Sequence, residues 1–453
     1  MPAMPASGEV TGRRPREDGA SFRVTATSRP WRPWILPSLC WLVGVAACTV
    51  LVSWAWGETA QLAHRNLLLS DLFLAVENAQ VDLQHGGLTH LYAGQGSLEV
   101  ALPGFQLALV ALLRLVDALG APAYIGFTLK GGRFANFAVG GSWAFLLFAV
   151  YGLALSAVFP VVACLRRCGV HGVTLALAAV ATTGALGYSA VLWGHPEVGL
   201  ATGLLVGAAL WCLDGRWKGA AWLLGAAVAT QPLVLLGLPL LLGLAGVRRW
   251  LPMAWRIILP GLVSVLLPLF GDPGDTFRQV VLQPTYPTST GYNLLTPWLA
   301  VVPSHGPDTV DAGWPRTVAL VLAIGIAYVM VRRMNRYAGA VPDVVIWTLG
   351  LSLAVRCLFE AVFYTYYAVP AVVLLLVAAS ARGAWRALGV IVVATAFFVF
   401  PFEVRHADHV ENLALVAVAM VAMVALSAPW SWLQAARRSS PAPQVAAAPV
   451  GLP

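Results

Sequence analysis

Two carboxylates near the end of the first strongly apolar segment are suited to proton-transfer chemistry. Asp71 lies close to the expected outer membrane boundary, and Glu77 follows six residues later. A carboxylate there could take the proton of a hydroxyl group or orient that hydroxyl, as a general base does. A structural role is the alternative for Asp71, because the helix macrodipole stabilises a carboxylate at a helix start. Asp71 is the candidate catalytic residue, and Glu77 is a candidate binding residue.

Candidate anion-binding cations are few on the expected outer face. Lys130 and Arg133 lie in a Gly-rich loop before a helix and could bind phosphate or anchor the chain at lipid headgroups. Arg356 lies in an apolar segment, where an ionisable residue is usually functional or paired. Glu360 follows at the spacing of an intrahelical ion pair, so both roles stay open for Arg356. Arg405 is a further outer cation.

Two histidine-containing segments could carry chemistry. His195 and Glu197 form a tight turn, which could line a site or cap a helix. His406, Asp408 and His409 have a metal-like spacing but lack a clear partner ligand, so no metal site is predicted and a divalent cation remains an alternative.

The elements that must position these residues are membrane helices. The 453 residues are 59% apolar and only 11% charged, far from the composition of a soluble domain. Stretches of the length needed to cross a bilayer must satisfy their backbone hydrogen bonds internally, which favours helices. The sequence therefore predicts an all-α, polytopic membrane protein with about 11–12 membrane helices. The expected segments are 34–56, 139–165, 172–193, 198–213, 219–230, 232–247, 252–270, 317–333, 343–360, 366–380, 385–401 and 411–430.

Arginine placement predicts the orientation of the chain. Arginine pairs recur in alternate connections, and the positive-inside rule assigns these connections, with both termini, to the cytoplasm. Although the net charge is +8, this distribution indicates topology and no nucleic-acid partner. Segment 219–247 begins and ends beside basic residues, with Gln231-Pro232 in its middle. It is expected to form two short helices or a re-entrant hairpin.

The domain organisation follows from this topology. The chain is divided into a basic cytoplasmic tail (1–33), a membrane domain (34–430) and a Pro/Ala-rich cytoplasmic tail (431–453). Outer loops 57–138 and 271–316 are long, whereas the inner loops are short. In the first outer loop, Leu72, Leu74, Val76 and Val81 indicate an amphipathic surface helix, and 99–119 is a second amphipathic stretch. The outer face is expected to carry the chemistry.

A series of motifs follows Asp71 in chain order. The motifs are Gly86-Gly87-Leu88, Leu91-Tyr92, Gly96-Ser97 through Leu112, Trp193-Gly194-His195-Pro196-Glu197, Gly225 to Thr230-Gln231-Pro232, and Tyr364-Thr365-Tyr366-Tyr367-Ala368-Val369-Pro370. Together they resemble the GT-C glycosyltransferases, and most closely the polyprenol-phosphate-mannose-dependent family 87, over roughly residues 34–400 in layout. The sequence departs from the family pattern at Ala101-Leu102-Pro103, where Tyr-Pro-Pro is usual, and at Gln231, which lies near a usual Lys.

This resemblance implies sugar transfer from a polyprenyl-phosphate donor to a lipid or glycan hydroxyl, with Asp71 as general base. Mannose is the expected sugar, with arabinose or another pentose as the alternative. No resident cofactor is expected. The predicted location is the plasma membrane, with the site on the extracytoplasmic side. Candidate substrate-binding residues are Glu77, His85, Lys130, Arg133, His195, Glu197, Tyr292, Arg356, Glu360, Tyr364, Tyr367, Arg405 and His406.

A membrane transporter or lipid-linked-sugar flippase is the alternative function. Charged residues within the membrane and a broken helix fit both classes. A transporter is expected to place polar residues at the midplane of the membrane, whereas here they gather near the outer boundary. That distribution favours an enzyme.

Overall fold

The computed structural model is helical and confirms the predicted all-α polytopic membrane class. Within the residues it describes, seven helices are long and apolar enough to cross a membrane, and four shorter apolar helices accompany them. The seven long helices establish the polytopic class, and the number of 11–12 membrane helices stays a prediction. The described residues are 32–58, 70–84, 89, 103–130, 133–277, 314–337, 341–359, 365–403 and 409–438.

Five helices of the N-terminal half pack closely. Trp41 on α1 donates its indole N–H to the carbonyl oxygen of Gly152 on α4, at 2.8 Å. A Cβ at Gly199 of α7 would lie 2.6 Å from the carbonyl oxygen of Ala154, so only glycine permits this helix contact. The five helices are α1 (Arg32–Glu58), α4 (Trp143–Leu155), α5 (Val158–Arg167), α6 (Gly172–Gly187) and α7 (Pro196–Leu213).

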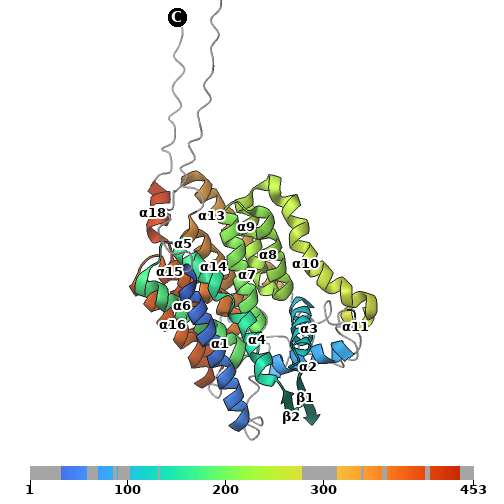
Figure 1. The fold of residues 1–453 in the computed structure, drawn as a ribbon. Helices are drawn as coiled ribbons and strands as arrows, with labels where there is room; N and C mark the ends of the chain where they lie inside the picture. Colours follow the sequence, from blue (N-terminus) through green and yellow to red (C-terminus); the bar gives the residue numbers. More distant parts are fainter. Residues whose placement is uncertain are drawn as a thin grey trace, which may run out of the picture.

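Two short helices lie within segment 57–138, as predicted. They are α2 (Ser70–Gln84) and α3 (Pro103–Ala118). α2 buries Leu72 and Val76, two of the apolar residues that predicted it. α3 lies directly below α8 in Figure 1, and a Cβ at Gly104 would lie 2.4 Å from the carbonyl oxygen of Ala229 on α8. The second amphipathic stretch is therefore packed against the membrane helices.

A β-hairpin follows α3, and the sequence analysis missed it. Strands β1 (Ala123–Lys130) and β2 (Arg133–Gly141) are antiparallel, with Lys130 paired to Arg133. The expectation that these two cations lie in a loop entering a helix is therefore wrong. Alternating apolar residues on both sides of a Gly-Gly pair are a hairpin signal. The expected span 139–165 consequently begins later, at Trp143, and is divided between α4 and α5.

Segment 219–247 forms a folded-back hairpin, one of the two predicted forms. α8 (Trp217–Thr230) ends at the extended residue Gln231, and η3 (Pro232–Gly237) and α9 (Leu238–Ala245) return. At 1.5 Å per residue, α8 is only about 21 Å long, too short for the hydrocarbon core. A short turn, η4 (Val247–Arg249), leads into α10 (Trp250–Gly271). The re-entrant form is therefore the better description.

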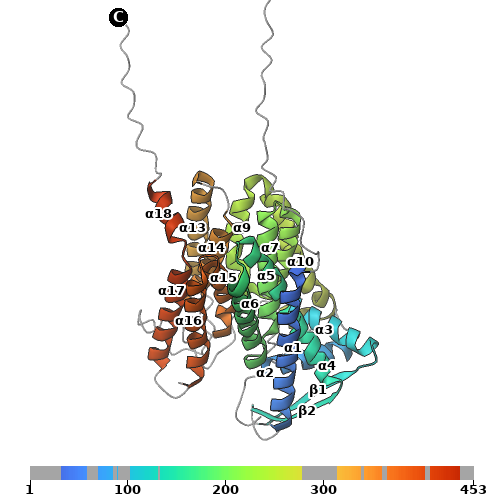
Figure 2. The ribbon, with the colours of Figure 1, turned by 60° about the vertical axis from the view of Figure 1, so that its left-hand side comes forward.

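The C-terminal half forms a second group of helices, in which α16 and α17 lie side by side (Figure 2). α18 occupies part of the region expected as a tail from residue 431, because Trp430 and Leu433 open an amphipathic helix. Beyond α10, the elements are α11 (Pro273–Phe277), α13 (Trp314–Tyr337), α14 (Pro342–Phe359), η7 (Thr365–Ala368), α15 (Val369–Ser380), α16 (Ala384–Glu403), α17 (His409–Ser427) and α18 (Trp430–Arg438).

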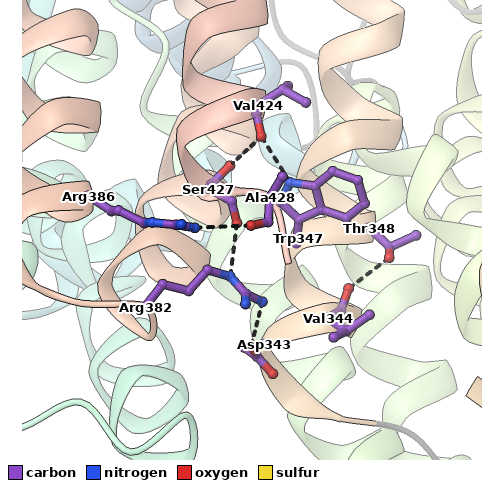
Figure 3. A network of polar contacts seen from close by, with 9 residues as sticks. All are labelled: Asp343, Val344, Trp347, Thr348, Arg382, Arg386, Val424, Ser427 and Ala428. Carbon is purple, nitrogen blue, oxygen red and sulfur yellow. Dashed lines mark hydrogen bonds and ion pairs between the residues drawn. The ribbon is translucent and has the colours of Figure 1, made fainter. Parts of the chain in front are cut away.

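A polar network joins helix ends of this second group (Figure 3). Arg382 contacts the carboxylate of Asp343 at 2.5 Å and donates to the carbonyl oxygen of Ser427 at 3.2 Å. Arg386 donates to the carbonyl oxygen of Ala428. Both arginines thus satisfy carbonyls at the C-terminus of α17, where positive charge is favoured. The network connects the starts of α14 and α16 with the end of α17.

Candidate functional site

A buried acid–base pair lies at the opposite end of the bundle from this network. Nδ1 of His195 lies 2.5 Å from Oε1 of Glu197, and both residues are only 4% exposed. Gly194 has φ +69°, which favours glycine, and Pro196 occupies the first turn of α7. These residues turn the chain sharply into α7 and place Glu197 at the helix N-terminus, where a carboxylate is stabilised.

Aromatic side chains pack on this pair. The ring of His195 stacks on Tyr366 of η7, with centroids 3.9 Å apart and an interplanar angle of 20°. Trp193 approaches Tyr366 at 5.5 Å, and Tyr366 meets Tyr367 edge-on at 4.5 Å. The turn between α6 and α7 therefore supports the segment that opens α15.

A small pocket begins on the other side of η7. Its lining combines the Arg356 side chain from the last turn of α14 with Tyr367 and apolar side chains, namely Leu233, Leu353, Cys357 and Pro370. Leu233 belongs to η3, so the pocket touches the break of the re-entrant hairpin. An arginine among apolar side chains can bind an anionic group that is attached to a hydrocarbon chain.

The structure therefore brings together four of the predicted binding residues. His195 and Glu197 lie at the start of α7, whereas Arg356 lies on α14 and Tyr367 on η7, more than 150 positions later in the sequence. Their convergence links the buried pair through Tyr366 to the pocket. His195 and Glu197 are buried at the turn that opens α7, the helix-start position that was one of the two predicted roles, and ligand binding by them stays a prediction.

The proposed general base lies on a different outer element. Asp71 is the second residue of α2, so the expected helix start is confirmed, although its side chain lies outside the described set. Glu77 is half-buried on the same helix. The catalytic assignment of Asp71 stays a prediction.

Sequence reasoning missed a buried carboxyl between α2 and α3. Gln106 donates its amide to Oδ2 of Asp82 at 3.0 Å and to the carbonyl oxygen of Ala75 at 3.3 Å. Burial raises the pKa of Asp82 to about 8, and the Gln106 hydrogen bond opposes this shift. The available signal was helical spacing, because Asp82 continues the buried face that includes Phe73, Val76 and Ala79.

Other predicted site residues stay untested. Lys130 is the last residue of β1 and Arg133 is the first residue of β2. Their side chains lie outside the described set. Within the described part of the chain, no group of three metal-ligating side chains gathers. The binding residues that lie wholly outside the described segments are His85, Tyr292, Glu360, Tyr364, Arg405 and His406.

Fold and site together define a polytopic α-helical membrane protein with a cationic pocket at one end of its bundle. Compared with models of known families and with curated proteins, the chain matches none.

Proposed function

We propose that the chain transfers a sugar from a polyprenyl-phosphate donor to a lipid or glycan hydroxyl on the extracytoplasmic face of the plasma membrane. The observation that carries the proposal is the pocket between α14, η7 and η3. Its lining combines Arg356 with Tyr367 and the apolar Leu233 and Leu353. A polyprenyl phosphate has the matching parts, because it joins one anionic headgroup to a long apolar chain.

The chemistry divides between two outer elements. Asp71 takes the proton of the acceptor hydroxyl while the oxygen of that hydroxyl attacks the anomeric carbon of the sugar. The bond from that carbon to the phosphate oxygen breaks, and the polyprenyl phosphate leaves with the bonding electrons. Arg356 stabilises the departing phosphate. Mannose is the first sugar to test, because the motif resemblance favours it.

A lipid-linked-sugar flippase is the second candidate. The observation that favours it is the helix break at Gln231, next to the pocket-lining Leu233. Broken helices commonly surround substrate sites in transporters. A flippase would move the lipid across the bilayer without forming a glycosidic bond, which separates the two candidates experimentally.

A transfer assay with purified protein tests the proposal. The protein in lipid nanodiscs receives radiolabelled polyprenyl-phosphomannose and a membrane lipid extract as acceptor. Wild type, Asp71→Asn, Arg356→Gln and the control Arg332→Gln are compared. Arg332 is exposed on α13, does not line the pocket, and controls for loss of an arginine.

We expect labelled product from wild type and from Arg332→Gln. Asp71→Asn should lower kcat by roughly 100-fold or more, because it removes the general base. Arg356→Gln should lower kcat/KM about tenfold or more, because it removes the cation that binds the donor phosphate and stabilises it as it departs. Folded wild type that transfers neither mannose nor arabinose contradicts the proposal. Movement of the labelled donor across a liposome membrane would then favour the flippase.

A further inference from the structure

The turn that follows α6 touches η7 at two consecutive residues. The hydroxyl oxygen of Tyr188 lies 2.6 Å from that of Thr365, and His195 stacks on Tyr366. Tyr188 opens a π-helical turn, η2 (Tyr188–Leu192), which widens the end of α6. These contacts bridge the N-terminal and C-terminal helix groups.

The turn that carries His195 is itself tied down. Ser189 donates its hydroxyl to the carbonyl oxygen of His195, and the backbone N–H of His195 donates to the carbonyl oxygen of Ser189, both at 3.0 Å. Glu197 then fixes the imidazole by its contact with Nδ1. A buried carboxylate without such a partner is costly, so the pair stabilises one orientation of the ring.

The position of Tyr366 affects the pocket directly. Its neighbour Tyr367 lines the pocket, and the two rings are in edge-on contact. The thiol of Cys357 lies 3.7 Å from the carbonyl oxygen of Tyr367, which it can reach as a weak donor. Cys357 also lines the pocket and is buried. A shift of η7 would therefore move Tyr367 and uncover Cys357.

We propose that His195 and Glu197 are positioning residues that seat η7 through Tyr366 and thereby shape the Arg356 pocket. They act without touching the ligand. The seating itself follows from the contacts above, whereas the identity of the ligand rests on the proposed function.

The native cysteine in the pocket wall provides the readout. In a protein that keeps only Cys357, with the other five cysteines replaced by alanine, the rate of N-ethylmaleimide labelling is followed by mass spectrometry. A second protein that keeps only Cys164 on α5 reports general loosening, because Cys164 is fully buried. Both proteins are studied in nanodiscs as full chains.

Three variants and one matched control are compared in each background. His195→Phe keeps an aromatic ring above Tyr366 but removes the contact to Glu197. Glu197→Gln keeps an acceptor oxygen for Nδ1 and serves as the conservative variant. Tyr366→Ala leaves the pair intact and removes the stack, so it tests the same seating if His195→Phe fails to fold. His171→Phe makes the same change at an exposed position before α6.

We expect His195→Phe and Tyr366→Ala to label Cys357 about tenfold faster or more than wild type, while Cys164 keeps its rate. The Cys357 labelling rate of Glu197→Gln should lie closer to that of wild type than the rate of His195→Phe does. The rate of His171→Phe should equal that of wild type. Equal acceleration of both cysteines would reveal general loosening and overturn the proposal. An unchanged Cys357 rate in folded His195→Phe and Tyr366→Ala would also overturn it.

The same labelling experiment with added lipid distinguishes this inference from the proposed function. Decaprenyl phosphate should slow Cys357 labelling in wild type, and His195→Phe should need about tenfold more lipid for the same protection. If decaprenyl phosphate protects Cys357 in wild type and the variants need no more lipid for the same protection, the lipid site is supported and the positioning role is contradicted. If Cys357 is labelled faster in the variants but decaprenyl phosphate protects it in no protein, the positioning role is supported and the lipid ligand is contradicted.

Discussion

The guanidinium carbon of Arg249 lies 5.0 Å from the ring centroid of Trp217, in a cation–π contact. Trp217 is the first residue of α8, and Arg249 ends η4 after α9. The contact therefore brings both ends of the α8–η3–α9 hairpin to one end of the bundle. Three basic residues, Arg216, Lys218 and Arg248, also flank the hairpin, so the positive-inside rule predicts that this end faces the cytoplasm.

The first prediction is that both ends of the α8–η3–α9 hairpin face the same side of the membrane. In a protein without its native cysteines, Lys218→Cys and Val247→Cys should both react with a membrane-impermeant maleimide only from the cytoplasmic side. Thr89→Cys, in the first outer loop, should react only from the opposite side and is the matched control. All three positions are exposed. Labelling of residues 218 and 247 from opposite sides would show that the segment crosses the membrane once.

The close approach of α3 to α8 gives the second prediction. A Cβ at Gly104 would meet the carbonyl oxygen of Ala229 at 2.4 Å, and this backbone atom cannot rotate away. Gly104→Ala should destabilise the protein by about 1–3 kcal/mol and lower the apparent melting temperature. Gly261→Ala in α10 is the control, because no atom lies within 4 Å of its Cβ position. Equal melting temperatures for the two variants would contradict the observed packing.

Much of the fold could be predicted because hydropathy and proline act locally. Apolar length indicated the membrane helices, and Pro232 marked the break in the re-entrant hairpin. The β-hairpin was not predicted, because a short, Gly-interrupted run such as 123–141 also fits a loop that leads into a helix. The interruption between α4 and α5 has little hydropathy signal, because Ser156 is a single polar residue within an apolar run.

The site was predictable residue by residue, but its assembly was not. His195, Arg356 and Tyr367 were singled out by type and expected depth. Their grouping depends on the contact between His195 and Tyr366, which local patterning cannot indicate. Similarly, Asp82 is buried only because α3 supplies Gln106 across the helix pair. Contacts between distant elements thus decided which polar residues became buried.

Asp82 gives a prediction about pH. Its pKa is about 8 in the folded protein against 3.8 as the ordinary value, so the folded chain retains a proton that the unfolded chain releases. The stability contributed by this group is fully present below pH 3.8 and is lost as pH rises toward 8. Asp82→Asn should therefore raise stability at pH 7.5 and flatten the pH dependence above pH 5.

Denaturation curves across this pH range check the prediction. Asp117→Asn is the matched control, because Asp117 is exposed on α3 and undergoes the same chemical change. Its pH dependence should follow that of wild type. If Asp82→Asn keeps the wild-type slope between pH 5 and 8, the buried carboxyl does not titrate in this window.

The last prediction compares two ion pairs that differ in burial. Arg382 and Asp343 are 12% and 21% exposed in their side chains, whereas Arg167 and Asp214 are 52% and 45% exposed. Asp343→Asn should cost about 1–3 kcal/mol, because Arg382 then keeps a half-desolvated charge without its carboxylate. Asp214→Asn should cost less than about 1 kcal/mol, because water and salt screen the exposed pair. Apparent melting temperatures at low and high salt measure both effects, and the Arg382→Gln/Asp343→Asn double variant isolates the coupling energy. A coupling energy near zero would mean that the carbonyls at the end of α17, and not Asp343, hold Arg382 in place.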